Sequence, residues 1–152
     1  MSKAEEARAL FLQGYNCCQS VVGAFAPEMG LELETAVRLA SGMGGGIGRL
    51  RSVCGACSGM CIAAGMLRGY SSPRATTEKT RTYAMIQQLV GQFQQKSGSM
   101  ICKELLGLDE PEGVAQASER TAEYYQKRPC PDLVAQAAGI LEEFLASEKP
   151  DV

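Results

Sequence analysis

Residues 52–68 read SVCGACSGMCIAAGMLR, a stretch that combines small residues, apolar residues and cysteines in a helical pattern. Ser52 is a helix-capping residue type and good helix formers follow it, so the stretch predicts a helix over residues 53–68. Residues three and four positions apart share one face of a helix. One face of this helix therefore carries Cys54, Cys57, Cys61, Ala64 and Leu67.

The segments on both sides favour the same secondary structure. Asn16 can cap one helix and Pro131 suits the first position of another, whereas the glycine-rich residues 41–48 indicate a loop. No stretch keeps the period-two alternation of a strand. Helices are predicted over residues 4–12, 17–26, 32–39, 53–68, 77–95, 100–106 and 132–145. Residues 111–113 are expected to be a connection, and a further helical segment after it runs through Tyr125. The sequence predicts an all-α fold, a single-domain bundle of about six to seven helices spanning residues 1–152.

Composition and charge narrow the functional classes. The chain has 152 residues, 45% hydrophobic and 21% charged, and its 15 basic and 17 acidic residues give a net charge of −2. This balance argues against nucleic acid or an anionic membrane as the main partner. The longest apolar runs, such as residues 60–67, are shorter than the about 20 residues that span a bilayer, so no membrane insertion is expected. The polar start lacks the pattern of a secretory signal, which predicts a cytoplasmic, thiol-reducing location.

The chain has seven cysteines and no histidine. The absence of histidine excludes Ser–His and Cys–His nucleophile pairs and any histidine metal ligand. An odd number of cysteines cannot be fully paired in intramolecular disulfides. In a cytosolic chain of this size, cysteines are more often catalytic or metal-binding than structural.

The positions of the cysteines indicate a common site. Cys54 and Cys57 form a C-x-x-C motif in the first turn of the predicted helix, where free N–H groups favour a thiolate; such a motif is a redox dithiol or half of a metal site. Cys17, Cys102 and Cys130 also stand at predicted helix starts. If these starts converge, four helix ends favour negative thiolates, a thiolate-bound metal or an iron–sulfur cluster. The alternative is that cysteines act as small buried hydrophobic residues, an interpretation most applicable to Cys18, Cys57 and Cys61.

The glycine-rich loop does not match a phosphate-binding motif. It allows either a close approach of backbone beside Cys54 or a flexible connection. Arg49 and Arg51 follow it. They hold an anionic substrate, keep thiolates charged, or are solvated loop charges, which is the commoner outcome.

A set of short motifs occurs in a fixed order along the chain. It comprises Gly14-Tyr15-Asn16-Cys17 with Gln19, the glycine run, Val53-Cys54-Gly55-Ala56 with Gly59, Gly98-Ser99 with Cys102, and Cys130-Pro131. Together these motifs resemble the C_GCAxxG_C_C family, whose four characteristic cysteines imply redox activity, and the resemblance extends from about residue 11 to residue 145. It implies that the family cysteines are Cys17, Cys54, Cys102 and Cys130. The family is also similar to the domain of split-Soret cytochromes in which cysteines hold a two-iron cluster.

The chain departs from the family pattern in three cysteines, Cys18, Cys57 and Cys61. Cys57 falls at a variable position of the motif. A Cys54–Cys57 exchange mechanism is therefore not implied by the resemblance, and the C-x-x-C motif is a feature of this chain.

Three functional hypotheses follow. The first is a redox protein in which Cys17, Cys54, Cys102 and Cys130 ligate a [2Fe–2S] cluster for electron transfer or redox sensing with a redox partner protein. The second is a metal-free thiol–disulfide oxidoreductase with a protein or a small thiol as partner. In it Cys54 attacks and Cys57 resolves, and Cys102 or Cys130 acts as a relay. The third is a structural zinc protein with the same four thiolate ligands and no enzymatic activity.

A homodimer is a further expectation. It rests on a stripe of small residues at helical spacing, Gly55, Gly59 and Ala63, which permits close contact between helices. The more direct interpretation of the same stripe is helix packing within one chain.

Overall fold

The computed structural model describes residues 1–107 and 115–147, and this part of the chain contains helices, turns and no strand. Its helices are α1 (Lys3–Leu12), α2 (Cys17–Ala24), α3 (Ala26–Met29), α4 (Leu33–Ala40), α5 (Gly55–Arg68), α6 (Thr76–Ser97), α7 (Cys102–Leu105), α8 (Ala122–Lys127) and α9 (Cys130–Ser147), and a 3-10 turn, η1 (Ser41–Met43), follows α4. The all-α class predicted from the sequence is confirmed.

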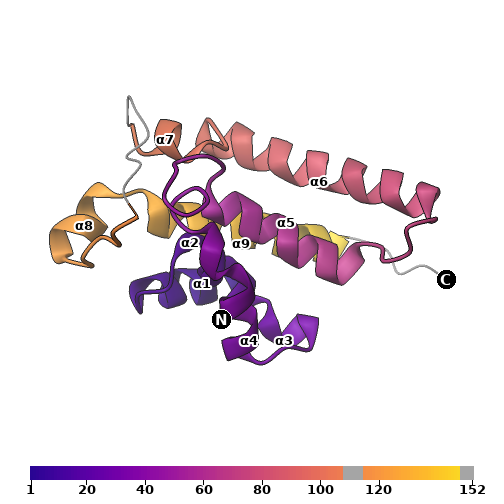
Figure 1. The fold of residues 1–152 in the computed structure, drawn as a ribbon, viewed down its shortest axis with the longest axis horizontal. Coiled ribbons are helices and arrows are strands. Elements are labelled where there is room, and N and C mark those ends of the chain that lie inside the picture. Colours follow the sequence, from indigo (N-terminus) through magenta and orange to yellow (C-terminus); the bar gives the residue numbers. More distant parts are fainter. Residues whose placement is uncertain (108–114, 148–152) are drawn as a thin grey trace.

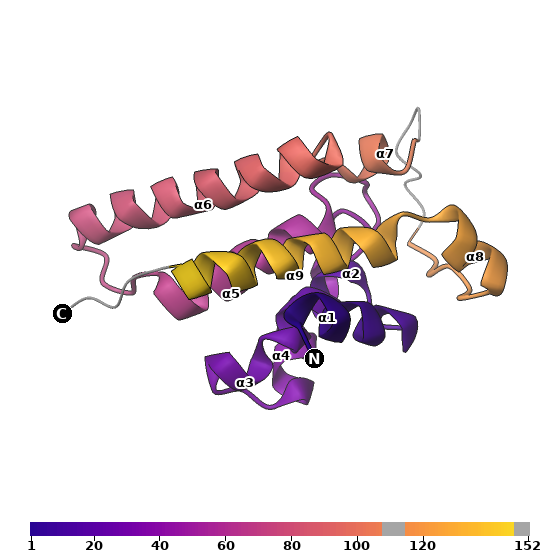
Figure 2. The same cartoon turned by 180° about the vertical axis from the view of Figure 1, so that it is seen from behind.

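Helices α5 and α9 lie side by side at the centre of the molecule (Figure 1). Helix α6 runs along one side of this pair and α1 to α4 pack on the other, as the view from behind also shows (Figure 2). The short helices α7 and α8 lie at the end of the molecule toward which the first residues of α5 and α9 point. The fold therefore brings the starts of several helices to one end of the bundle.

The contact between α2 and α5 depends on glycine. A Cβ atom added at Gly59 would lie 3.0 Å from the carbonyl oxygen of Cys18 and 3.1 Å from Cβ of Val21. At Gly55 it would lie 3.0 Å from Cβ of Cys17. These two members of the small-residue stripe are used within the chain, against α2, so this packing accounts for the feature that suggested a homodimer.

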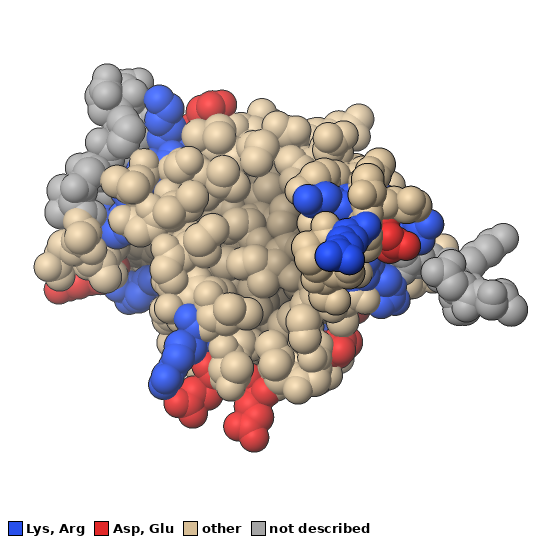
Figure 3. Space-filling model, turned by 45° about the vertical axis from the view of Figure 1, so that its right-hand side comes forward, with Lys and Arg blue, Asp and Glu red and all other residues tan. Residues whose placement is uncertain are grey.

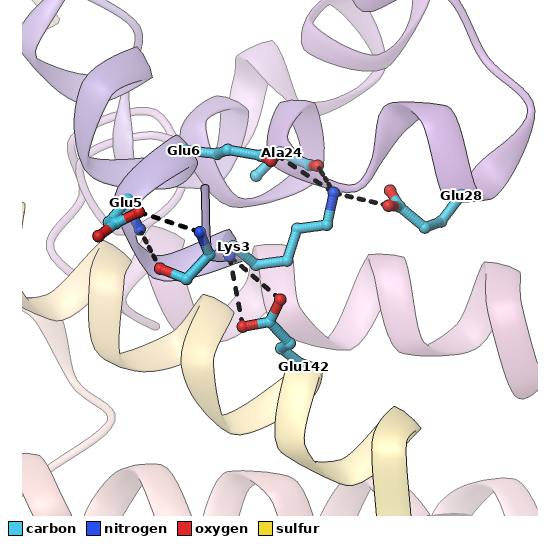
Figure 4. Close-up of polar contacts among 7 residues, drawn as sticks. Lys3, Glu5, Glu6, Ala24, Glu28 and Glu142 are labelled. Atoms are coloured by element: carbon cyan, nitrogen blue, oxygen red, sulfur yellow. Dashed lines mark hydrogen bonds and ion pairs between the residues drawn. The ribbon is translucent and has the colours of Figure 1, made fainter.

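The start of α1 is fastened to two other parts of the bundle (Figure 4). Nζ of Lys3 donates to the carbonyl oxygen of Ala24 over 2.9 Å and pairs with Glu6 at 3.2 Å and Glu28 at 2.6 Å. The Lys3 backbone N–H donates to the Glu142 carboxylate of α9 at 3.2 and 3.3 Å. Because the Lys3 side chain is only 12% exposed, salt screens these pairs less than fully exposed ones. They hold α1 against α9 and against the connection from α2 to α3.

The N-terminal boundary of α2 agrees with its sequence signal. The Asn16 side chain accepts from the Gln19 N–H over 2.9 Å, and the Gln19 side chain accepts from the Asn16 N–H over 3.0 Å. The C-terminal boundary differs from the prediction, because α2 ends at Ala24 rather than at residue 26. Pro27 lies in the first turn of α3, where a missing N–H costs no helical hydrogen bond.

The predicted start of α5 is wrong. The helix begins at Gly55, and its N-cap is Cys54 rather than Ser52. The Ser52 N–H donates to the carbonyl oxygen of Gly46 over 2.9 Å, and the Ser52 carbonyl accepts from the Cys102 N–H over 2.6 Å. These long-range bonds hold Ser52 in the preceding loop.

The same pairing shortens the helix predicted over residues 100–106. Helix α7 covers only Cys102–Leu105. The Met100 carbonyl accepts from the Cys54 N–H over 2.7 Å, and Ile101 forms an antiparallel bridge with Val53. This extended pairing prevents residues 100 and 101 from joining the helix.

Two boundaries near the C-terminus also differ. The helix predicted to run through Tyr125 is the short α8, because Thr121 caps it by accepting from the Tyr124 N–H over 3.1 Å. The connection predicted at residues 111–113 lies outside the described residues. Helix α9 begins at Cys130, so Pro131 occupies its second position rather than its first.

The surface gives two further observations. On the face shown in Figure 3, charged side chains of both signs lie near the edges, a group of Lys and Arg side chains lies right of centre, and a broad area to the left of this group is uncharged. This face carries no extended surface of a single charge. In residues 1–107 and 115–147, no helix combines the length and the apolar character needed to cross a membrane.

We expect Gly59→Ala to destabilise the protein, because the added methyl group meets the backbone of α2. Overpacking of this kind costs about 1–3 kcal/mol. Gly65→Ala in the same helix is the matched control: nothing lies within 4 Å of its added atom, and alanine is favoured over glycine inside a helix by about 0.5–1 kcal/mol. Urea unfolding measures both variants. Equal stability of the two would contradict the close contact between α2 and α5.

Candidate thiol site

Four cysteines from four separate helix starts surround one cavity. Cys17, Cys102 and Cys130 are the first residues of α2, α7 and α9, and Cys54 is the N-cap of α5. The cavity has a volume of ≈ 60 Å³. Its other lining residues are Phe11, Asn16, Gly45, Gly46, Arg51, Gly55, Leu105, Leu106, Arg120, Tyr124 and Leu133. The structure thus brings together the four cysteines that sequence reasoning had selected.

Three of the four cysteines are buried, and Cys17 is partly exposed. Cys54 is 3% exposed, Cys102 7% and Cys130 8%, and all seven cysteines of the chain are free thiols. In the part of the chain that the structure describes, no group of three or more His, Cys, Asp or Glu side chains is arranged around a single point to hold a metal ion.

Backbone pairing places Cys54 beside Cys102. The Cys54 N–H donates to the Met100 carbonyl, and the Cys102 N–H donates to the Ser52 carbonyl. A third backbone hydrogen bond runs from the Lys103 N–H to the Arg51 carbonyl over 3.2 Å. Two segments far apart in the sequence are thereby joined just before α5 and at the start of α7. The sequence gave no strand signal for this pairing, because each participating segment is only a few residues long.

The glycine-rich loop packs directly against this pairing. A run of residues in it has positive φ, comprising Gly45, Gly46, Ile47, Gly48, Arg49 and Arg51. A non-glycine residue in this region costs about 1–2 kcal/mol. A Cβ atom at Gly46 would lie 2.6 Å from Cβ of Cys102 and 2.7 Å from the Ser52 nitrogen. Of the two alternatives for the loop, a close backbone approach is observed, but it is made to Cys102 and Ser52 rather than to Cys54.

Arg51 lies inside the site and not in solvent. Its residue is 6% exposed, and its Nη1 lies 3.7 Å from the Cys102 sulfur. Of the interpretations that the sequence left open, solvated loop charge does not fit Arg51, and its position beside the Cys102 sulfur suits a charge that favours thiolates. Arg49 is only partly buried and does not line the cavity.

The thiols of Cys17 and Cys130 are in contact. The Cys17 thiol donates a hydrogen bond to the Cys130 sulfur, which raises the pKa of Cys17 and lowers that of Cys130. Burial adds to the rise at Cys17 and opposes the fall at Cys130, where the charges of Arg128, Arg120 and Arg51 also favour the thiolate. Cys130 is thus the thiol of this cavity whose pKa is lowered.

Burial dominates at the other two cysteines. It raises the pKa of Cys54 to about 12, although the N–H groups of Cys57 and Ala56 at the start of α5 favour the thiolate. It also raises the pKa of Cys102, against the effect of the Arg51 side chain. Both sulfurs therefore stay protonated at neutral pH unless a further positive charge enters the cavity.

An arginine and two aromatic rings close one side of the cavity. The Arg120 guanidinium carbon lies 4.2 Å from the centre of the Phe11 ring and 5.0 Å from that of Tyr124. Arg120 also donates to the carbonyl oxygens of Phe11 over 3.0 Å and Tyr15 over 2.9 Å, at the end of α1. Sequence reasoning missed this group, since no local pattern connects residues more than 100 positions apart.

The predicted Cys54–Cys57 dithiol is divided between two environments. Cys57 is completely buried and does not line the cavity. Its thiol is hydrogen-bonded to Cys61 instead. Cys18 and Cys61 do not line the cavity either. The cavity therefore holds Cys54 but not its predicted resolving partner.

The fold and the cavity define a cysteine-rich, all-α protein. The chain belongs to the C_GCAxxG_C_C family, since the family model, described as "putative redox-active protein (C_GCAxxG_C_C)", matches residues 15–144. No curated protein and no solved structure gives a match to the chain. The resemblance found in the sequence is confirmed. The family description places the chain among redox-active proteins and names no substrate, cofactor or partner.

We expect Gly46→Ala to disturb the site, because its methyl group would overlap Cys102 and the chain at Ser52. Gly48→Ala is the control, since it has positive φ as well but nothing within 4 Å of the added atom. Both variants carry the backbone cost of about 1–2 kcal/mol, and Gly46→Ala adds about 1–3 kcal/mol of overpacking. Urea unfolding and the alkylation rate of Cys102 measure the effect. Identical results for the two variants would refute the loop packing.

In the metal-free protein, Cys17→Ala should raise the pKa of Cys130, because the variant removes the hydrogen bond that stabilises the Cys130 thiolate. At neutral pH less of Cys130 is then ionised, so its alkylation slows and the pH profile of alkylation moves to higher pH. Cys17→Ser keeps an O–H donor and should retain most of the lowering. If Cys17→Ala left the pH profile of Cys130 alkylation unchanged, the hydrogen bond from Cys17 would not be what lowers the pKa of Cys130.

Proposed function

We propose that this protein carries a [2Fe–2S] cluster on Cys17, Cys54, Cys102 and Cys130 and uses it for electron transfer or redox sensing with a partner protein. The observation that supports the proposal is the convergence of these four thiols on one buried cavity. Four cysteine ligands are the usual complement of such a cluster. A cytoplasmic location, which keeps thiols reduced, fits this use.

The size of the cavity suits the group. At ≈ 60 Å³ the cavity exceeds the roughly 10–15 Å³ that one water needs, so it has room for a group of several atoms such as two irons and two sulfides. A [2Fe–2S] cluster shares its four ligands between two metals, whereas one zinc ion requires all four sulfurs at about 2.3 Å.

The electrostatics of the site suit a net negative group made of thiolates and sulfide. Arg51, Arg120 and Arg128 all favour the charged form of Cys130, and the N–H groups of Ala56 and Cys57 at the start of α5 favour the charged form of Cys54. The positive charge of the iron ions would stabilise Cys54 and Cys102 as thiolates, which burial disfavours in the metal-free protein. In this account the burial that keeps these thiols neutral without metal becomes favourable once metal is bound.

When bound, the cluster supplies reversible one-electron chemistry. The residues of this chain hold it and determine its surroundings. Burial of the cysteines would keep water away from the cluster. Arg51 beside Cys102 would favour the reduced, more negative state of the cluster, and Phe11 and Tyr124 cover one side of the cavity. Hydrogen bonds and charges of this kind tune the reduction potential of such clusters.

One observation favours a second function, metal-free thiol–disulfide exchange. Cys17 and Cys130 are in contact, and Cys130 has the lowered pKa of an attacking thiol. The Cys130 thiolate would attack one sulfur of a partner's disulfide and form a mixed disulfide, and Cys17 would then attack the Cys130 sulfur. Cys17 and Cys130 would end as a disulfide, and the partner's two sulfurs would leave as thiols that carry the two protons. This pair would replace Cys54 and Cys57 in the roles expected from the sequence.

The test is anaerobic purification followed by visible spectroscopy and analysis of iron, sulfide and zinc. We expect iron and sulfide in equal amounts, two of each per chain, with the charge-transfer bands of a cluster. Cys130→Ser should lose most of the iron, while Cys61→Ser, which lies outside the cavity, should retain it. A colourless protein with stoichiometric zinc would favour the structural alternative, and one without metal would favour thiol exchange; either result would overturn the cluster.

A further inference from the structure

A second cleft adjoins the thiol cavity on the side of the glycine-rich loop. Its volume of ≈ 490 Å³ lies within the range of about 300–1,000 Å³ that is usual for pockets that bind small organic molecules. The cleft and the thiol cavity share five lining residues, which are Asn16, Gly45, Arg51, Arg120 and Tyr124. None of the four site cysteines lines the cleft. The two hollows are therefore neighbours with a common wall, and the cleft is separate from the site proposed for the cluster.

Three arginines from two segments of the chain line this cleft. Arg49 and Arg51 follow the glycine-rich loop, and Arg120 lies just before α8. Among the described residues that line the cleft, none is acidic. A concave surface that carries several positive charges raises the local concentration of anions. The composition of the wall therefore indicates a negatively charged ligand.

Arg120 is held in this wall by neutral groups. It donates to the carbonyl oxygens of Phe11 and Tyr15, and its guanidinium group lies against the rings of Phe11 and Tyr124. Within the part of the chain that the structure describes, no Asp or Glu side chain forms an ion pair with Arg120. Carbonyl oxygens and ring faces orient the side chain but do not neutralise its charge. Because the side chain is already fixed, an anion that binds to it loses less affinity to ordering.

The loop directs Arg49 into the cleft through an unfavourable backbone conformation. Residue 49 has a φ of 65°, a region in which any residue with a Cβ atom is strained. Positions 45, 46 and 48 of the same loop also have positive φ and are glycines. A Cβ atom at Gly45 would lie 2.7 Å from Cγ of Arg49, so the loop is shaped to receive the arginine side chain. Strain of this kind is found where a side chain serves a function, and here that side chain lines the cleft.

The depth of two of the arginines favours a small ligand over the surface of another protein. Arg51 is only 6% exposed and Arg120 is partly buried, so a carboxylate on a flat protein surface cannot reach both. A small molecule can enter the cleft. Arg51 and Arg120 lie at the wall shared with the thiol cavity, whereas Arg49 does not line that cavity. A ligand that contacts all three therefore extends along the cleft and carries more than one anionic group.

We infer that the cleft binds a small organic anion with two oxyanion groups, each a carboxylate or a phosphate. One group faces Arg51 and Arg120 beside the thiol cavity, and the other faces Arg49. The guanidinium group presents paired N–H donors whose geometry matches both kinds of oxyanion. Binding at this site does not require iron in the thiol cavity, so the inference goes beyond the proposed function and does not rest on it.

The experiment is calorimetric titration of the full-length, anaerobically purified protein with two probes. Succinate carries two carboxylates, and 2-phosphoglycolate carries one carboxylate and one phosphate. We expect saturable binding of one molecule per chain for at least one of them, and the probe that binds more tightly identifies the preferred oxyanion. Succinamide, the uncharged analogue of succinate, should not bind.

Variants of single arginines locate the binding. Arg49→Gln should weaken it about tenfold or more, because it removes a charged donor from the cleft. Arg49→Lys keeps the charge without the paired donors and should fall between Arg49→Gln and the unmodified protein. Arg38→Gln is the matched control: it also removes one positive charge, but from an exposed side chain of α4 outside the cleft, and it should bind as the unmodified protein does.

Saturable binding of neither probe, or equal affinities of Arg49→Gln and Arg38→Gln, would overturn the inference. Urea unfolding shows whether each variant keeps the fold, and if Arg49→Gln does not fold, the comparison of Arg49→Lys with Arg38→Gln decides. Iron measured on the same samples separates this result from the proposed function. A protein without iron that still binds a probe would contradict the cluster alone, and an iron-containing protein that binds neither would contradict this site alone.

Discussion

The close packing of α2 on α5 is the constraint on which the site depends. Gly55 and Gly59 leave room for the backbone of α2, and this contact sets the start of α2 beside the start of α5. Cys17 and Cys54 stand at those starts. A larger side chain at either glycine would separate the helices and, with them, two walls of the cavity.

The remaining two thiols reach the cavity by different means. Cys102 is placed by the short backbone pairing of residues 51–53 with residues 101–103, and the glycine-rich loop covers it. Cys130 is placed by α9, which packs along α1, α2 and α5. The site is therefore assembled from long-range contacts, and it can be complete only when most of the bundle has formed.

Burial and charge act against each other at this site. Removing thiols from water disfavours their ionised forms, so Cys54 and Cys102 have raised pKa values. Helix starts and arginines act in the opposite direction, but in the thiol state only Cys130 has a lowered pKa among the four. This imbalance is the physical reason to expect a positively charged group in the cavity.

Local signals in the sequence were sufficient to predict the fold class and to select the four cysteines that line the cavity. Asn16 with Gln19 is a complete capping box that can be recognised in the sequence, and each cysteine stands next to a helix boundary. The cap of α5, the burial of Arg51 and the position of Arg120 could not be predicted, because each depends on partners distant in the chain. The orientation of Cys57 toward Cys61 also requires the structure, since a C-x-x-C motif alone does not show where its second thiol points.

The most direct test of the account is alkylation mapping of the anaerobically isolated protein before and after iron is removed by a chelator. The account predicts that Cys17, Cys54, Cys102 and Cys130 are protected together and become reactive together, while Cys61 reacts at the start. Protection of only some of the four, or release of one without the others, would contradict a single site that all four cysteines share.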